Sequence, residues 1–260
     1  MKNISKPLIT LPILISLSPY AFAEDNIQDM SDPLSVYTQA GLGYTDKGLN
    51  VKIGRSYDTG IENTAGMNVF ELKGIGGESL GWNGSSRENN NDSPSLIRFR
   101  NFQANIKNGQ AKQIDINYDL NNEMGTASYS FIQALPQIGP FNFFPLAGVG
   151  ASFGNNVVGD DGETISGYSI PGTFIVAGTY AKLALTEKIW LNYNPMWKKT
   201  LSGSDTYKDH GFEDNNNVLA HEFAASYQIN PRFNVRYFAN WSENTNFSDG
   251  SHRIEFNYQF

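Results

Sequence analysis

The sequence predicts an all-β protein, a transmembrane, antiparallel, up-and-down β-barrel of about twelve strands, with ten strands as the alternative. Three observations support this prediction. The end of the chain alternates strictly between apolar and polar residues, segments with the same period recur along the whole chain, and short connections alternate with long ones. A strand between lipid and a wet interior needs this alternation, because successive side chains point to opposite faces of a sheet.

The amino-terminal region, residues 1–23, is predicted to be a cleaved secretory signal. A basic start is followed by an apolar stretch from Pro7 to Leu17 and then by the A-x-A site Ala21-Phe22-Ala23. No later segment approaches the roughly 18 consecutive apolar residues that a membrane-spanning helix requires. We therefore expect residues 24–260 to form a single barrel domain, because a closed barrel is the other structure that satisfies its backbone within a bilayer.

Strands are expected in order along residues 34–260. The first alternates from Leu34 to Tyr44, and the turn Thr45-Asp46-Lys47-Gly48 leads into the second, which includes Leu49, Val51 and Ile53. The other expected strands are residues 65–75, 95–107, 112–120, 124–134, 141–154, 172–185, 189–199, 218–229, 233–242 and 252–260. Strand 65–75 alternates poorly, which keeps the ten-stranded alternative open.

The lengths of the connections give an independent check on this count. Those after even-numbered strands are mostly short, at 107–110, 136–140, 186–188 and 230–232. Those after odd-numbered strands include the long ones, at 76–94, 155–171, 200–217 and 243–251. Short periplasmic turns and longer outer loops are the expected asymmetry of a bacterial barrel. Pro145 and Pro195 fall within expected strands, and each should mark a bulge or a strand end because proline donates no ladder hydrogen bond.

Composition excludes several classes of function. The chain has 26 acidic against 19 basic residues and a net charge of −7, which argues against a nucleic acid partner. It contains no cysteine, so neither a disulfide framework nor a thiolate site is expected. No pattern in the sequence indicates a cofactor.

The ending Phe256-x-Tyr258-x-Phe260 resembles the assembly signal of Gram-negative outer-membrane barrels, with Glu255 where a glycine is usual earlier in that signal. The alternation of the whole chain resembles the small porin-like members of that class. The resemblance implies export by the general secretory route, contact with outer-membrane lipid and lipopolysaccharide, and recognition of Phe256, Tyr258 and Phe260 by the barrel-assembly machinery. It also implies a monomer. Twelve-stranded relatives include porins for acidic oligosaccharides, nucleoside channels and phospholipases, and no motif here selects one of them.

Inward-facing polar residues follow from the same alternation. A cation that faces lipid at the midplane costs roughly 2–4 kcal/mol, so charged strand residues are expected to face the lumen. The predicted lumen-lining residues are Asp115, Asn117, Asp119, Lys182, Lys198, Glu222, Arg236, Arg253 and Glu255. This wall carries both signs of charge, which suits either a channel for small polar solutes or a barrel plugged by its own side chains.

Arg98 and Arg100 do not fit the simple pattern. If Phe102, Ala104 and Ile106 face lipid, strict alternation would place both arginines outside as well. A bulge near Asn101 would instead turn the arginines into the lumen, which we favour. The remaining alternative is that they lie at the outer rim and bind lipopolysaccharide phosphates.

The sequence therefore predicts a narrow passive channel for small hydrophilic solutes, with a non-conducting structural or adhesin-type barrel as the alternative. An outer-membrane hydrolase is less favoured, since neither His221-Glu222 nor Ser251-His252 places neighbouring side chains on one face of a strand. The acidic loop residues Asp160, Asp161 and Glu163 lack a recognised calcium spacing. We interpret them as a solvated turn and expect no catalytic or metal site.

Overall fold

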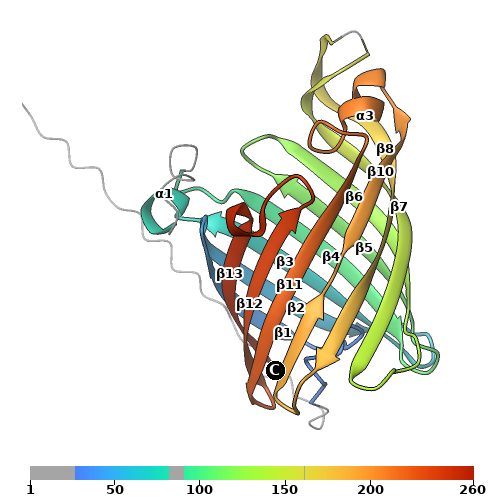
Figure 1. Ribbon diagram of the computed structural model, residues 1–260, viewed down its shortest axis with the longest axis vertical. Helices are drawn as coiled ribbons and strands as arrows, with labels where there is room; N and C mark the ends of the chain where they lie inside the picture. Colours follow the sequence, from blue (N-terminus) through green and yellow to red (C-terminus); the bar gives the residue numbers. More distant parts are fainter. Residues whose placement is uncertain (1–26, 82–90, 161) are drawn as a thin grey trace, which may run out of the picture.

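The computed structural model describes residues 27–81, 91–160 and 162–260, so the expected signal lies outside the described residues. Within them the strands form one antiparallel sheet that closes on itself (Figure 1). The strands are β1 (Gln39–Thr45), β2 (Gly48–Asp58), β3 (Thr64–Ile75), β4 (Leu96–Asn105), β5 (Gln110–Asp119), β6 (Met124–Gln133), β7 (Phe141–Val158), β8 (Thr164–Ala184), β9 (Ile189–Tyr193), β10 (Met196–Gly203), β11 (Asn217–Asn230), β12 (Phe233–Ser242) and β13 (Ser251–Gln259). The short helices are α1 (Gly77–Leu80), α3 (Asp205–His210) and η1 (Phe247–Asp249).

The barrel wall consists of twelve strands when β9 and β10 are counted as one, which confirms the predicted count. β9 and β10 are two halves of one interrupted strand, because each pairs with β8 on one side and with β11 on the other. The break falls at Asn194 and Pro195, so Pro195 ends a strand as predicted. Pro145 lies inside β7, pairs in unbroken register with Thr179, and adjoins Leu146, the last β7 residue paired with β6.

The two ends of the barrel differ as the connection lengths predicted. The end that holds the five turns after β2, β4, β6, β8 and β11, together with the carboxyl terminus, is called here the terminal end. The opposite, loop end holds α1, α3, η1 and the tall β7–β8 hairpin (Figure 1). The prediction of a long loop at 155–171 is wrong, because β7 runs to Val158 and β8 begins at Thr164.

Burial along the strands follows the predicted period of two. In β13, Glu255, Asn257 and Gln259 are buried inside the barrel, whereas Phe256 and Tyr258 are exposed on its exterior. β13 pairs with β1 and with β12, and so closes the sheet. The terminal alternation thus marks the closing strand.

The interior is apolar on one side. Buried apolar side chains from β4 to β8 pack together with one from β11, one from the α3 loop and one from the amino-terminal segment: Phe102, Ala104, Ala111, Ile132, Phe144, Leu146, Phe174, Val176, Val218, Phe212 and Leu34. Phe174 is 1% exposed and packs edge to face on Phe212, with ring centroids 5.4 Å apart. A Cβ on Gly150 would lie 2.3 Å from the Phe174 ring, so glycine makes room for this ring. Polar side chains such as Arg98, Arg100 and Asp115 share these strands with the cluster, and polar side chains also line the inward faces of β1 to β3, β12 and β13.

Among the described residues, no helix is both long enough and apolar enough to cross a membrane.

Candidate functional site

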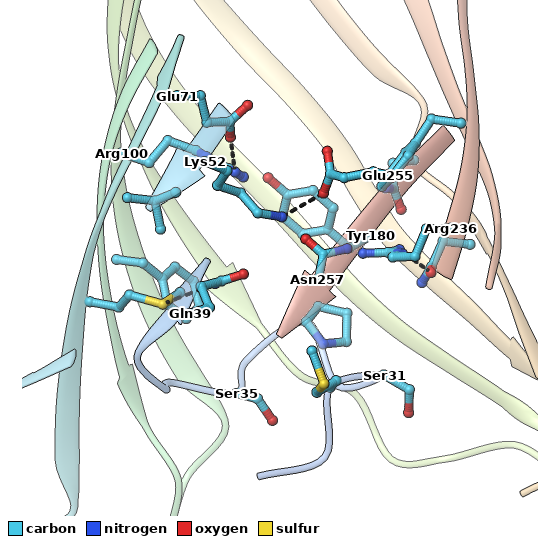
Figure 2. Close-up of a pocket in the computed structure, with 18 of the residues that line it drawn as sticks. Ser31, Ser35, Gln39, Lys52, Glu71, Arg100, Tyr180, Arg236, Glu255 and Asn257 are labelled. Carbon is cyan, nitrogen blue, oxygen red and sulfur yellow. Dashed lines mark hydrogen bonds and ion pairs between the residues drawn. The ribbon is translucent and has the colours of Figure 1, made fainter. Parts of the chain in front are cut away.

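Residues 28–37, called here the inner segment, enter the interior from the terminal end (Figures 1 and 2). Gln28 and Gln259 exchange two hydrogen bonds, from Gln28 N to Gln259 Oε1 at 3.0 Å and from Gln259 Nε2 to Gln28 O at 2.9 Å. Met30 and Leu34 are buried, and Leu34 belongs to the apolar cluster. The segment therefore narrows the barrel at this end.

Two aspartates shape the inner segment into successive turns. Asp29 Oδ1 accepts from Ser31 N at 2.8 Å, and Asp32 Oδ1 accepts from Leu34 N at 2.8 Å. Lys182 of β8 donates to Ser31 Oγ, and its Nζ lies 3.5 Å from Asp29 Oδ2. The sequence Asp-Met-Ser-Asp-Pro thus folds on itself, because aspartate side chains cap the backbone N–H two residues on.

These aspartates have opposite pKa shifts. Burial raises the pKa of Asp29, but the hydrogen bonds from Ser31 and the charge of Lys182 outweigh it and hold the pKa below its ordinary value of 3.8. Burial raises the pKa of Asp32 above that value, the bond from Leu34 only partly offsets it, and the nearby Asp29 charge adds to the rise.

Above the inner segment lies a central cavity of about 220 Å³, lined by residues of β1 to β4, β9 and β11 to β13 among others. A second cavity of about 680 Å³ lies towards the loop end, where Lys47, Asn121 and Asn122 line it. The two cavities share Arg98, Glu222 and Arg253 as lining residues. Polar cavities therefore lie on both sides of this layer of three charged side chains.

Ion pairs link different strands around the central cavity (Figure 2). Arg100 of β4 bonds Glu71 of β3 at 2.5 Å, and Lys52 of β2 bonds Glu255 of β13 at 2.6 Å. Arg98 holds Asp115 through two nitrogens, at 2.9 Å from Nε and 2.5 Å from the terminal nitrogen. Such bidentate pairing fixes the arginine and satisfies both carboxylate oxygens.

Arg236 differs from these cations in having neutral partners. Its Nε donates to Ser226 Oγ at 2.9 Å, and its terminal nitrogen donates to Asn192 Oδ1 at 2.8 Å. The guanidinium carbons of Arg236 and Arg253 lie 4.7 Å and 4.0 Å from the ring centroid of Phe238. Phe238 therefore supports two cations on one wall through cation–π contacts.

The predicted lumen residues lie in three groups. Glu222, Arg236, Arg253 and Glu255 line the central cavity, and Asp119 lines the cavity at the loop end. Asp115 is paired with Arg98, and Asn117 Nδ2 donates to Asp115 Oδ1 at 3.2 Å. Lys182 binds the inner segment, and Lys198 pairs across the ladder with Val176, one of the buried interior residues.

The structure places Arg98 and Arg100 on the interior wall, without the bulge near Asn101. The register of β4 with β3 and with β5 is unbroken through Asn101. Phe102 and Ala104 also face inward, at 7% and 0% exposure, so the prediction that they face lipid is wrong. The cause is the apolar half of the interior, in which these two side chains pack.

Sequence reasoning missed Lys52, Glu71 and Lys73. Glu71 is 5% exposed and binds both Arg100 and Lys73, the latter at 2.9 Å. Its strand alternates poorly because Met67 and Val69, on the same inward face, are apolar. The signal that could have found Glu71 is the rule against charge on the lipid face, applied to β3.

The histidines of the strands face outward. His221 Nδ1 lies 2.8 Å from Tyr193 OH, and His252 Nδ1 lies 2.7 Å from Tyr237 OH. Both rings stack with aromatic neighbours on the exterior, and in the described part of the chain neither ring forms a hydrogen bond with a serine. Within that part, no group of three or more His, Cys, Asp or Glu side chains is arranged to hold a metal ion. Asp161 lies outside the described residues.

Comparison with solved structures places the fold. The NanC porin superposes with a TM-score of 0.53 over 86% of this chain and 100% of its own, at 10% sequence identity. The KdgM porin gives a TM-score of 0.44 at 8% identity, over 86% of this chain and 99% of its own. The translocator domain of the autotransporter NalP from Neisseria meningitidis gives a TM-score of 0.48 at 12% identity, over 88% of this chain and 91% of its own. No family model and no curated protein matches the sequence. The chain thus has the porin-like fold of outer-membrane barrels, as predicted.

Proposed function

We propose that this barrel is a narrow passive channel of the Gram-negative outer membrane for small hydrophilic solutes, with a preference for anions. The terminal end faces the periplasm and the loop end faces outward, in keeping with the short turns of outer-membrane barrels on their periplasmic side. Assembly depends on the closing strand, with Phe256, Tyr258 and Phe260 on its outer face.

The observation that carries the proposal is the charged interior, with two polar cavities in succession between the loop end and the inner segment. Cationic residues on the inward face outnumber acidic ones, although the whole chain has a net charge of −7. On the strands, the inward cations are Lys52, Lys73, Arg98, Arg100, Lys182, Lys198, Arg236 and Arg253, and the inward acids are Glu71, Asp115, Asp119, Glu222 and Glu255. Outside the strands, Lys47 adds a cation to the cavity lining, Asp32 adds an acid, and Asp29 pairs with Lys182. Charge of one sign along a narrow polar path attracts solutes of the opposite sign.

The inner segment sets the size limit of the channel. It borders the central cavity of about 220 Å³ through Met30, Ser31, Pro33 and Tyr37. A water molecule occupies about 30 Å³ of liquid, so this cavity accommodates several waters or one small organic solute. We expect a small conductance for the intact protein and a larger one when the inner segment is displaced.

Purified protein in a planar bilayer tests the proposal. We expect discrete, small conductance steps, and a reversal potential in a salt gradient that reports preference for the anion. Heat-modifiable migration on a gel verifies that the barrel is folded. Folded protein that never conducts would exclude the channel.

A non-conducting adhesin-type barrel is the second candidate, and one observation favours it. The β7–β8 hairpin rises above the loop end and exposes Ile165, Tyr168 and Ile170, at 46%, 65% and 66%. Exposed apolar side chains on a protruding element are typical of an interaction surface. Binding of the folded barrel to other cells, lost on substitution of these three residues by serine, would support this alternative.

A further inference from the structure

The exterior of the barrel carries a polar patch over β2 to β5, towards the terminal end. Its members are Arg55, Tyr57, Asn68, Asn101, Gln103 and Lys112, called here the exterior patch. They face outward because their strand neighbours face inward, as Met67 and Val69 do beside Asn68. Elsewhere the exterior is mostly apolar, as with Ile254 and Phe256 on β13.

The patch forms two adjacent rows across the sheet. Arg55 pairs with Asn68, and Asn68 pairs with Asn101 in the next strand. Asn101 Nδ2 donates to Tyr57 OH at 2.6 Å and to Asn68 Oδ1 at 2.8 Å, and Gln103 Nε2 donates to Tyr57 OH at 3.0 Å. The register and these bonds make the patch one connected surface.

Several hydrogen-bonding groups of the exterior patch have no partner within one chain. Among the described residues, the amide oxygens of Asn101 and Gln103 accept no hydrogen bond, and the exposed Arg55 has no partner. Asn68 lies four positions inside β3 from its terminal-end residue, Thr64, and therefore within the wall rather than at its edge. Hydrocarbon offers such groups no partner, and a lipid-facing arginine costs roughly 2–4 kcal/mol at the midplane and about 0–1 kcal/mol near the interfaces.

We propose that the exterior patch is the contact of a two-fold symmetric dimer with a second copy of this chain. Amide side chains both donate and accept, so a surface of amides is complementary to itself. A two-fold axis along the membrane normal at Asn68 places β2 of one copy opposite β4 of the other. Arg55 of each copy then meets the free oxygens of Asn101 and Gln103 in the partner. The proposal is independent of conduction, and it departs from the monomer expected from the sequence.

Cysteine cross-linking in native membranes tests this contact, because the chain has no cysteine of its own. Asn68 lies at the axis, so Asn68→Cys should give a disulfide-linked dimer under mild oxidation. Arg55→Cys and Asn101→Cys should link only when the two variants are expressed together. Tyr227→Cys is the matched control, since this exposed residue lies on β11, across the barrel, and should give no dimer.

A second variant separates loss of contact from loss of folding. Asn68→Leu with Asn101→Leu suits a lipid-facing wall, so the barrel should stay heat-modifiable while the dimer mass measured in mild detergent is lost. A monomer mass for the folded wild-type protein, together with no cross-link through residue 68, would overturn the proposal. A phospholipid that copurifies with that monomer and not with the double variant would instead identify a lipid headgroup as the occupant.

Discussion

Lys182 Nζ of β8 lies 3.5 Å from Asp29 Oδ2, and this pair ties the barrel wall to the inner segment. Lys182 also donates to Ser31 Oγ, so one side chain holds two residues of the segment. Asp29 keeps 63% of its side chain exposed, whereas Lys182 keeps 13%. The lysine is therefore the more buried member of the pair, and we expect the segment to be the part that moves when the pair is broken.

Replacing Lys182 with methionine should raise the conductance. The change removes the pair with Asp29 and the bond to Ser31, and a hydrogen bond to a charged group contributes about 1.5–3 kcal/mol. The undocked population should then rise by about tenfold or more. Single-channel recording measures this, with Lys188→Met in the exposed turn after β8 as the control. Unchanged conductance in Lys182→Met would show that the segment does not limit flow.

The conductance should depend on pH in two phases. Asp32 has a raised pKa in the docked segment, so docking tightens and conductance falls as the pH drops through that pKa towards 3.8. Asp29 has a lowered pKa, so its contribution to docking is present above 3.8 and is lost as the pH falls further through the docked value. Conductance should therefore rise again at the most acid pH.

Three variants assign these two phases. Asp32→Asn should abolish the first phase, because an amide keeps the acceptor for Leu34 N and does not titrate. Asp29→Asn should abolish the second. Asp58→Asn, at the exposed end of β2, should leave both phases in place. A single phase that survives all three changes would assign the pH dependence to other groups.

Ion preference should follow the charge of inward residues only. Lys198 and Lys199 are neighbours in β10, and Lys198 faces inward whereas Lys199 is exposed outside. Lys198→Gln and Arg236→Gln should each shift the reversal potential towards cations, whereas Lys199→Gln should not. Asp115→Asn with Asp119→Asn should shift it towards anions. Equal effects of the two lysine changes would contradict the assigned register of β10.

Assembly should depend on the exterior aromatics of the closing strand. Tyr258 and Phe260 are 41% and 52% exposed, with ring centroids 5.2 Å apart, on the strand that pairs with β1. Replacing both with serine should leave the protein unassembled and degraded in the periplasm, as judged by membrane fractionation. Tyr168→Ser, which alters an exposed aromatic of the β7–β8 hairpin, should assemble normally. Full assembly of the double variant would argue that other strands direct insertion.

The apolar half of the interior should supply much of the stability of the fold. Phe174→Ala removes a ring that is 1% exposed and should lower the free energy of unfolding by roughly 3–5 kcal/mol. Ile175→Ala, at the adjacent outward position, should lower it by less, because the Ile175 side chain faces the exterior. Denaturant unfolding in detergent, followed by tryptophan fluorescence, measures both. Similar costs for the two variants would show that the cluster is not the stabilising core.

The sequence predicted twelve strands because the count follows from a period of two. The prediction of inward charges rests on the same period. It misplaced Phe102 and Ala104, since alternation gives two faces without saying which is the wetter one. The sequence did not predict that Glu71 faces inward, because apolar Met67 and Val69 lie on the same face of β3. The inner segment was interpreted as part of the first strand from Leu34, and only its long-range contacts with Lys182 and Gln259 place it inside.

The two unlike sides of the interior have a consequence for any molecule that passes through. Phe102 borders the central cavity and also belongs to the apolar cluster, whereas Arg236 and Arg253 border it from the opposite group of strands. A solute in a uniformly polar pore has no preferred orientation, whereas here we expect its apolar part to face Phe102 and its ionic group to face the arginines. For the proposed channel, we therefore expect solutes that carry their ionic and apolar groups on separate faces to pass faster than equally charged solutes that do not.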